Sequence, residues 1–279
     1  MSKRHFRFSR GPLERLRAHA RELPGESAVP TPPLAEDEAG LGLQSASVTH
    51  IGLVRANNQD TVLEKDRVFG VCDGMGGHRG GEVASAVAAE SFLAALEGRE
   101  PSAEAMREAV DAANTAVWEK AQGDEELSGM GTTLTALWLS GGRAFIAHVG
   151  DSRCYRMRDG SLRRITEDHS MVMEMLRAGV ITAEQAETHP MRNIITRAVG
   201  TEETVETDLI EEDSRPGDIW LVCSDGLYSM VPDEAISSTL AALGRQPDQA
   251  VQALLDAALA AGGRDNISIS LIRDRGDSR

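Results

Sequence analysis

The sequence predicts an α+β fold in which antiparallel sheets are covered by helices on their outer faces. Apolar strands follow one another between residues 132 and 166, and glycine turns such as "SGGR" and "RDGS" join them. Short turns between consecutive strands require antiparallel pairing. Helices are expected in pairs that do not alternate strictly with the strands, which argues against a doubly wound fold.

The first half of this fold begins with two strands and two helices. Strands are predicted at "SVTHIGLV" (47–54) and "RVFGVCD" (67–73), and the second is nearly all apolar and therefore buried. Helices are predicted over residues 82–96 and 102–122. Ser102 is suited to cap the second of them, because apolar residues recur behind it at helical spacing.

The second half starts after a segment, residues 168–200, in which a short helix is mixed with irregular polar chain. "DIWLVCSDG" (218–226) then predicts a buried strand. Two helices follow, each with a proline near its first turn, Pro232 and Pro247. The alternating "NISISLI" (266–272) predicts the last strand.

Residues 1–44 differ in composition from the rest of the chain. They are first basic and then rich in proline and acidic residues, so we expect a mostly disordered tail before a domain at residues 45–275. The alternative is a short amphipathic helix around Leu13 and Leu16 that docks a partner.

Composition excludes several classes of protein. The net charge of −15 argues against binding to nucleic acid or an anionic membrane, and no apolar run approaches the ~20 residues of a membrane span. Cys72, Cys154 and Cys223 are odd in number and scattered, which supports neither a zinc site nor a disulfide framework. We therefore expect a cytoplasmic protein with reduced thiols.

Five aspartates lie at the ends of predicted strands or in the turns beside them. Strand ends of one layer converge on one rim, where several carboxylates would repel one another unless cations separated them. Oxygen ligands of this kind suit Mg²⁺ or Mn²⁺. The five residues are Asp60, Asp73, Asp151, Asp225 and Asp265.

Each of these signals is weak when it stands alone. "DG" is a common turn signal, and Asp159-Gly160 is interpreted as a hairpin turn only. "GMGGHRGG" lacks the ending of a P-loop and the spacing of a dinucleotide loop. A lone histidine such as His78 is more often a surface or capping residue than a catalyst.

The order of the motifs is more specific than any one of them. The chain carries "GLVRANNQD", "VCDGMGGHRGGEVAS", "GMGTTLTAL", "AHVGDSRCYRMRDG", "ITEDHS", "NIITRAVG", "DIWLVCSDGLYSMV" and "GGRDNISI" in succession. In this it resembles the metal-dependent serine/threonine protein phosphatases of type 2C, the PPM family, in their bacterial form. The resemblance runs from about Ser45 to Arg273.

The resemblance implies a four-layer α/β/β/α sandwich, two antiparallel sheets flanked by helix pairs, with two Mn²⁺ or Mg²⁺ ions at one rim. It implies that Asp73 bridges the two ions, that the Gly74 carbonyl adds a ligand, and that a third ion binds through Asp151. It further implies that Asp225 and Asp265 complete the coordination of one ion and that Asp60 contributes to the coordination of the other. Arg55 is implied to hold the substrate phosphate.

Two positions depart from the pattern of the family. Gln59 stands where many members have Glu, which puts the strength of metal binding in doubt. Met75 stands where eukaryotic members have the histidine proposed as general acid, so His78 is a weak candidate for that role. Residues 168–200 match the family's flap, whose His169, His189 and Arg192 are candidates for substrate contact.

The function that the resemblance implies is hydrolysis of phosphoserine and phosphothreonine in proteins by metal-activated water. The expected partners are phosphorylated proteins, a bacterial Ser/Thr kinase and its substrates, and the expected state is a monomer. One alternative is a sporulation-type relative that acts on a single anti-sigma antagonist domain. The other is an inactive scaffold that binds phosphoproteins, which the presence of Asp73, Asp225 and Asp265 disfavours.

Overall fold

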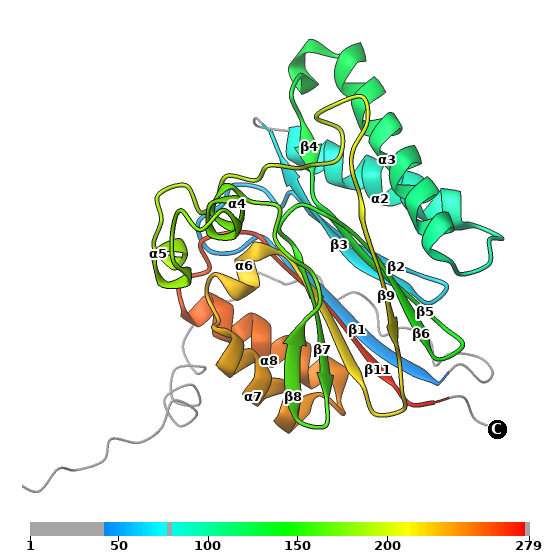
Figure 1. Ribbon diagram of the computed structural model, residues 1–279, viewed down its shortest axis with the longest axis vertical. Coiled ribbons are helices and arrows are strands. Elements are labelled where there is room, and N and C mark those ends of the chain that lie inside the picture. The colour runs from blue at the N-terminus through cyan, green and yellow to red at the C-terminus, as the bar shows by residue number, and fades with distance from the viewer. Residues whose placement is uncertain (1–41, 77–79, 277–279) are drawn as a thin grey trace, which may run out of the picture. The chain divides into compact units, whose positions relative to one another are not determined.

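Two antiparallel sheets form the centre of the computed structural model, which describes residues 42–76 and 80–276 (Figure 1). The five-stranded sheet has the order β1 (Leu43–His50), β11 (Ile267–Asp274), β10 (Ile219–Cys223), β7 (Arg153–Arg158) and β8 (Ser161–Arg164). The six-stranded sheet has the order β2 (Asp60–Lys65), β3 (Val68–Met75), β5 (Leu134–Ser140), β6 (Arg143–Val149) and β9 (Asp208–Asp213), with β4 (Gly131–Thr132) paired to β3.

Helices cover the outer face of each sheet. The long pair α2 (Gly80–Leu96) and α3 (Ala103–Gly123) packs on the six-stranded sheet, and α6 (Asp225–Tyr228), α7 (Asp233–Leu243) and α8 (Pro247–Ala260) pack on the five-stranded one (Figure 1). The prediction of a four-layer sandwich is therefore confirmed. The remaining helical elements are η1 (Glu125–Leu127), α4 (Met171–Arg177) and α5 (Ala183–Glu187).

Alternation along the strands creates three apolar cores, one between each pair of layers. In β5, Leu134, Ala136 and Trp138 point to the helices while Leu137 and Leu139 point to the other sheet. In β10 the same period of two sends Leu221 to the helices and Trp220 to the space between the sheets. Because both faces are buried, these strands read as continuous apolar runs.

Local chemistry fixes the ends of several elements. The Ser102 hydroxyl accepts a hydrogen bond from the Ala105 N–H at 3.1 Å, which confirms the predicted cap of α3. Asp159 and Gly160 both have positive φ, 51° and 78°, as a two-residue hairpin turn requires. Helix α2 begins at Gly80, two residues earlier than predicted.

Strand β9 is absent from the sequence prediction. Four of its six residues, "DLIEED", are acidic, and no residue of the strand is fully buried. It is the outermost strand of its sheet and pairs only with β6, so one of its edges needs no apolar neighbour.

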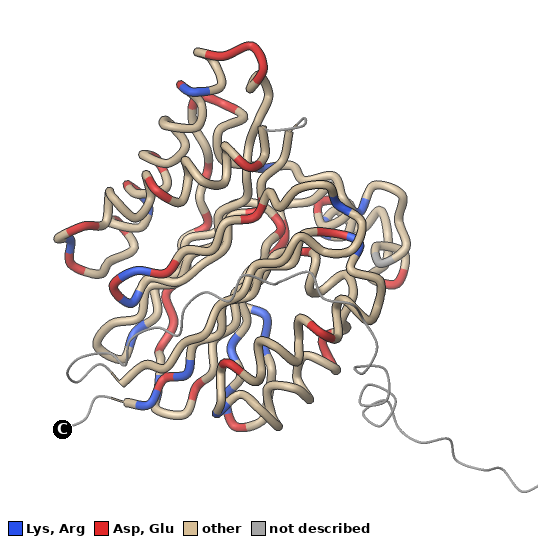
Figure 2. Tube along the Cα trace, turned by 180° about the vertical axis from the view of Figure 1, so that it is seen from behind, with Lys and Arg blue, Asp and Glu red and all other residues tan. Residues whose placement is uncertain are grey.

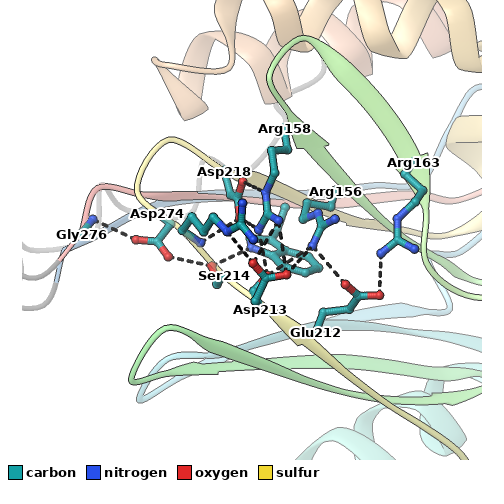
Figure 3. Close-up of polar contacts among 11 residues, drawn as sticks. Arg156, Arg158, Arg163, Glu212, Asp213, Ser214, Asp218, Asp274 and Gly276 are labelled. Atoms are coloured by element: carbon teal, nitrogen blue, oxygen red, sulfur yellow. Dashed lines mark hydrogen bonds and ion pairs between the residues drawn. The ribbon is translucent and has the colours of Figure 1, made fainter.

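An ion-pair network ties β9 to the other sheet (Figure 3). Arg158 on β7 binds both carboxylate oxygens of Asp218 and both of Asp213. Arg156 donates to Glu212 at 3.1 Å, and Arg163 donates to the same carboxylate from β8. These contacts lie at the ends of β7 and β10 that are remote from Asp151 and Asp225, so they join the sheets opposite the predicted metal rim.

Charged residues of both signs are spread along the described trace. Figure 2 shows Lys and Arg positions interspersed with Asp and Glu positions on strands, helices and loops. On α3, for example, Arg107 pairs with Glu104 and Asp111. None of the described helices combines the length and the apolar character needed to cross a bilayer.

The predicted tail lies almost wholly outside the described residues. Strand β1 begins at Leu43, two residues before the expected start of the domain at residue 45. The end of the tail therefore contributes the first two residues of an edge strand.

Candidate metal centre

Asp60 and Asp73 lie opposite each other on neighbouring strands. The register of β2 and β3 makes them direct partners, so their carboxylates start from adjacent backbone positions. The backbone of Asp73 is held from a third strand, because its N–H donates to the Thr133 hydroxyl at 2.9 Å and its C=O accepts from the Thr132 hydroxyl at 2.9 Å. One member of the pair is thereby fixed to a rigid sheet.

Asp225 belongs to the other sheet and reaches the same place. It is the first residue of α6, two residues after the end of β10, and the intervening Ser224 donates its hydroxyl proton to Asp60 Oδ2 at 2.8 Å. A Cβ on Gly226 would come within 1.9 Å of the Asn266 carbonyl oxygen. Gly226 therefore permits the close approach of the segments that follow β10 and precede β11, while the Ser224–Asp60 hydrogen bond joins this sheet to the other one.

Asp265 and Asp151 complete the group from two further loops. Asp265 lies two residues before β11, and its Oδ2 accepts a hydrogen bond from Arg55 Nη2 at 2.6 Å. Asp151 lies between β6 and β7, where the Tyr228 hydroxyl donates to its backbone C=O at 3.0 Å. All five predicted carboxylates thus come from strand ends or adjoining loops on one rim.

The proximity of the carboxylates is expressed in their pKa values. Removal from water raises the pKa of Asp73 well above its usual range, and the charges of Asp60, Asp225, Asp151 and Asp265 raise it further. Burial, followed by the charges of Asp151, Asp265 and Asp60, does the same to Asp225. Burial raises the pKa of Asp60 to about 6. Uncompensated negative charge is the dominant property of this rim.

The pKa of Asp151 is also raised, but the largest effect of a nearby charge comes from a residue outside the group of five. Its pKa is raised to about 6 by burial and then by the charge of Asp168 at the start of the flap. Asp151 therefore lies between the four other carboxylates and the flap.

The donor set fits hard divalent cations. Asp60 Oδ1 and Asp225 Oδ1 are buried and have no hydrogen-bond partner within the protein, although buried polar atoms are normally satisfied. Among the described residues no group of three or more His, Cys, Asp or Glu side chains is arranged so that it could hold a metal ion by itself. Mg²⁺-like ions keep several waters and need only one or two protein carboxylates each. Buried carboxylate oxygens without a protein partner are consistent with such ions.

Gly74 is required by close packing. A Cβ at this position would lie 2.0 Å from the Gly81 carbonyl oxygen and 2.5 Å from that of Gln59. The Gly74 N–H donates to the Gln59 C=O at 3.1 Å. The backbone of the residue after Asp73 is thus fixed against the loop that carries Asp60, and its carbonyl as a metal ligand stays a prediction.

Arg55 is the cation of the site. Its side chain is 51% exposed, and it contacts Asp265 while the charges of Asp225 and Asp73 act on it from further away. An exposed guanidinium at the edge of a carboxylate cluster is placed to meet an anion that arrives from solvent.

The four predicted flap and loop residues have different surroundings. His189 is half-buried, and its Nδ1 accepts from the Met191 N–H at 3.2 Å. His169 is only 6% exposed; its Nδ1 accepts from the Gly150 N–H at 3.0 Å and its Nε2 lies 3.2 Å from Asp208. These contacts hold the start of the flap to the Asp151 loop and leave little surface for substrate. Arg192 is exposed beyond α5, and His78 lies outside the described residues.

Several residues around the rim have no role in the sequence prediction. Arg153 stacks on Tyr228 at 3.6 Å and binds Asp168, Ser224 donates to the carboxylate of Asp60, and Asn266 accepts from the Gln59 N–H beside Asp60. Only their position in the sequence could have indicated a role, because each of these residues lies next to or near a strand-end aspartate. Their partners are 15 to 215 residues away in sequence and follow only from the fold.

Comparison with known proteins identifies similar chains. The family model for protein phosphatase 2C matches residues 53–261. Serine/threonine protein phosphatase PstP of Mycobacterium tuberculosis is 42% identical over 234 residues, which cover 82% of this chain and 44% of PstP. The chain thus spans less than half the length of that relative. Serine/threonine phosphatase stp of Listeria monocytogenes is 38% identical over 80% of this chain and 93% of its own length.

Solved structures agree with the sequence comparison. The crystal structure of the M. tuberculosis phosphatase PstP aligns with a TM-score of 0.79 and 39% identity, covering 84% of this chain and 99% of that one. The PstP catalytic domain in complex with two manganese ions aligns with a TM-score of 0.75 and 38% identity, covering 83% and 97%. The fold described above therefore occurs in a protein whose structure contains two manganese ions.

Proposed function

Because the chain belongs to the protein phosphatase 2C family, we propose that it is a metal-dependent phosphatase that hydrolyses phosphoserine and phosphothreonine in proteins. The observation that carries the proposal is the rim of five carboxylates, in which two buried oxygens lack partners and one exposed arginine faces outward. Such a rim needs cations for its own stability and attracts a phosphate through them.

Asp73 is the central residue of the proposed metal site, because the other four carboxylates all act on it. It would hold two Mn²⁺ or Mg²⁺ ions together with Asp225 and Asp265 on one side and Asp60 on the other, and with the Gly74 carbonyl. When bound, such ions lower the pKa of a coordinated water and neutralise charge on the phosphate. The two manganese ions of the PstP catalytic domain support this assignment.

Arg55 would bind and orient the phosphoryl group. Its planar guanidinium can donate two parallel hydrogen bonds to phosphate oxygens, and its exposure allows a bulky phosphoprotein to reach it. In the structure it is held near the rim by Asp265. Binding of substrate there would place phosphorus beside the carboxylates rather than above the flap.

A protein thiol is a poor candidate nucleophile. Cys72 is adjacent to Asp73 but is fully buried, and burial together with the charges of Asp60 and Asp73 raises the pKa of its thiol. The thiolate that a nucleophile requires is therefore disfavoured at this position. Water is the remaining nucleophile at the rim, in agreement with the proposed reaction.

A further part of the proposal concerns the partners of the protein and its location in the cell. We infer a cytoplasmic monomer that opposes a bacterial Ser/Thr kinase in signal transduction and acts on the proteins that kinase phosphorylates. A third ion at Asp151 and substrate contacts from the flap, with Arg192 as the exposed candidate, complete it.

The test is Mn²⁺-dependent hydrolysis of p-nitrophenyl phosphate and of a phosphothreonine peptide. The Asp73→Asn and Asp225→Asn variants should lose more than about 100-fold in kcat/KM, since even residues that only support metal ligands cost 10–100-fold. Asp159→Asn is the matched control, because it makes the same change in a hairpin turn outside the rim. Wild-type hydrolysis no faster than that of both rim variants would refute the proposal.

A further inference from the structure

Asn266 uses its whole side-chain amide on one loop. It is 5% exposed, and its Nδ2 donates both protons, one to the Ile51 C=O at 2.9 Å and one to the Asn57 C=O at 3.0 Å. Its Oδ1 accepts from the Gln59 N–H at 2.8 Å. Three backbone groups within nine residues therefore converge on a single side chain more than 200 residues away in sequence.

The loop that Asn266 holds carries two residues of the proposed site. Arg55 lies between the two carbonyls that accept from the amide, and Asp60 directly follows Gln59. The loop is not otherwise closed by a regular hydrogen-bond ladder, since it connects β1 to β2, which lie in different sheets. Its conformation thus depends on individual contacts such as those of Asn266.

Asn266 also joins the other proposed ligands. Its own N–H donates to Asp265 Oδ1 at 2.8 Å, and Arg55 donates to Oδ2 of the same carboxylate. Through the Gln59 backbone it is connected to Gly74, whose N–H donates to the Gln59 C=O. The side chain of Asn266 therefore contacts Gln59, which precedes Asp60 and also bonds Gly74. Its backbone N–H contacts Asp265 directly.

We propose that Asn266 is the positioning residue of the site: its amide fixes the loop of residues 51–59, and with it Arg55 and Asp60, relative to Asp265. The inference rests on the proposed function for the roles of these residues. It adds a residue that touches neither metal nor phosphate and acts through those that do.

The chemistry at this position requires an amide. Alanine would remove the donor from the half-buried Ile51 and Asn57 carbonyls and the acceptor from the half-buried Gln59 N–H. Aspartate would keep the acceptor for Gln59 but would place a carboxylate oxygen against the Ile51 and Asn57 carbonyls, and would add charge to an already negative rim. Only a short side chain with one acceptor and two donors satisfies all three groups.

The chain offers a matched control in Asn114. This residue of α3 is 2% exposed, donates from Nδ2 to the Glu202 and Glu203 carbonyls at 3.1 and 3.0 Å, and accepts from the Gly200 N–H at 2.7 Å. It performs the same three-point backbone clamp at a place where none of the five rim carboxylates is involved. Asn114→Ala thus loses the same kind and number of hydrogen bonds as Asn266→Ala.

The experiment measures Mn²⁺ binding by isothermal titration calorimetry on the full chain, for wild type, Asn266→Ala, Asn266→Ser and Asn114→Ala. Inorganic phosphate inhibition and the kcat and KM for p-nitrophenyl phosphate are measured beside it. The Asn266 variants should lose about 10-fold to 100-fold in Mn²⁺ affinity and should show a raised KM and weaker phosphate inhibition. Asn114→Ala should stay within about threefold of wild type in these quantities while its melting temperature falls.

A structural role alone would make the two asparagines equivalent. Asn266 variants that melt lower but bind Mn²⁺ and phosphate as Asn114→Ala does would overturn the proposal. Asn266→Ser keeps a short polar group, so it provides a folded protein for the comparison should Asn266→Ala not fold. An unchanged Mn²⁺ affinity in that variant would equally overturn it.

The design also separates this inference from the proposed function. Absence of hydrolysis by the wild type would refute the phosphatase activity, whereas the Mn²⁺ affinities of the Asn266 and Asn114 variants would still decide whether Asn266 positions the rim. Hydrolysis with normal Mn²⁺ binding in all variants would leave the function standing and refute the role of Asn266.

Discussion

The guanidinium of Arg153 binds both carboxylate oxygens of Asp168, with Nε–Oδ1 at 3.0 Å and Nη2–Oδ2 at 2.7 Å. Both side chains are largely buried, 17% and 9% exposed, and the guanidinium also stacks on the Tyr228 ring. Arg153 lies two residues after Asp151, and Asp168 begins the flap. The pair therefore connects the loop of the proposed third-ion residue to the start of the flap.

Arg153→Ala should destabilise the protein by about 3–5 kcal/mol, because it leaves the buried carboxylate of Asp168 without its partner. Urea unfolding measures this. The exposed pair Arg177–Glu167, 67% and 62% exposed, is the comparison, and Arg177→Ala should change the free energy of unfolding by no more than about 0.5 kcal/mol. Equal effects of the two substitutions would show that the Arg153 pair is not the buried linkage described.

Asp225→Asn should raise the melting temperature of the metal-free protein. Burial and the charges of Asp151, Asp265 and Asp60 raise the pKa of Asp225, so its charged form opposes folding at neutral pH. The folded state binds the proton more tightly than the unfolded chain, and stability of the wild type in EDTA should therefore fall as pH rises through the raised pKa. Each kcal/mol gained corresponds to about 2–4 °C in a domain of this size.

Added Mn²⁺ should raise the melting temperature of the wild type above that of Asp225→Asn. An ion that binds only the folded protein stabilises it by about 2.7 kcal/mol at 100 times its Kd, and Asp225→Asn should lose most of this gain. Thermal melts with EDTA and with Mn²⁺ give both quantities. A variant that melts below wild type in EDTA would contradict the repulsion inferred for the rim.

Arg55→Ala should act mainly on substrate binding. Removal of a bidentate phosphate contact should raise KM for p-nitrophenyl phosphate and weaken phosphate inhibition by about 10-fold, since charged hydrogen bonds contribute roughly 1.5–3 kcal/mol. Stability should change little, because the pair with Asp265 is half exposed. Arg55→Lys keeps the charge but not the planar fork, and should recover only part of the loss. A fall in kcat at unchanged KM would contradict this assignment.

His148 should make the protein sensitive to acid. It is fully buried, and burial followed by the nearby His169 lowers its pKa from 6.5 to about 4. The unfolded chain therefore binds a proton between pH 6.5 and 4 that the folded protein does not. As the pH falls from 6.5 to 4, the contribution of His148 to the free energy of unfolding therefore decreases by up to about 3 kcal/mol, at 1.36 kcal/mol per pKa unit.

His148→Gln removes the titrating group and keeps a neutral polar side chain. Urea unfolding at pH 7.5, 5.5 and 4.5 should show a shallower loss of stability in the variant than in wild type. The rim carboxylates act in the opposite direction but are common to both proteins. A His148→Gln profile parallel to wild type would contradict the assignment.

The fold and much of the rim could be predicted because their signals are local. Apolar runs that end in Asp73 and Asp225 identify strand ends, and the order of the motifs identified the family and the sandwich, both of which are confirmed. Register is not local: nothing in "DTVLEK" says that Asp60 opposes Asp73. Strand β9 escaped prediction because its polar residues are typical of a loop as well as of an edge strand.

Side-chain partners were the least predictable feature. Asn266 looks like any polar residue after a turn, and only the packing of β11 against the loop of residues 51–59 reveals its three backbone contacts. His169 resembled a substrate-contacting residue because it lies in the flap motif, yet the structure places its ring in the interior against Gly150. These outcomes depend on contacts between distant segments, which a pattern in one segment does not contain.

The crowding of carboxylates has a consequence for laboratory evolution of this protein. A library selected only for survival of heating in a chelating buffer would favour neutral residues at positions 60, 73, 151 and 225, where the charged form opposes folding. The most heat-stable variants would therefore be inactive. The same library heated in Mn²⁺ should keep the aspartates, and the positions at which the two selections diverge would outline the metal site by genetics alone.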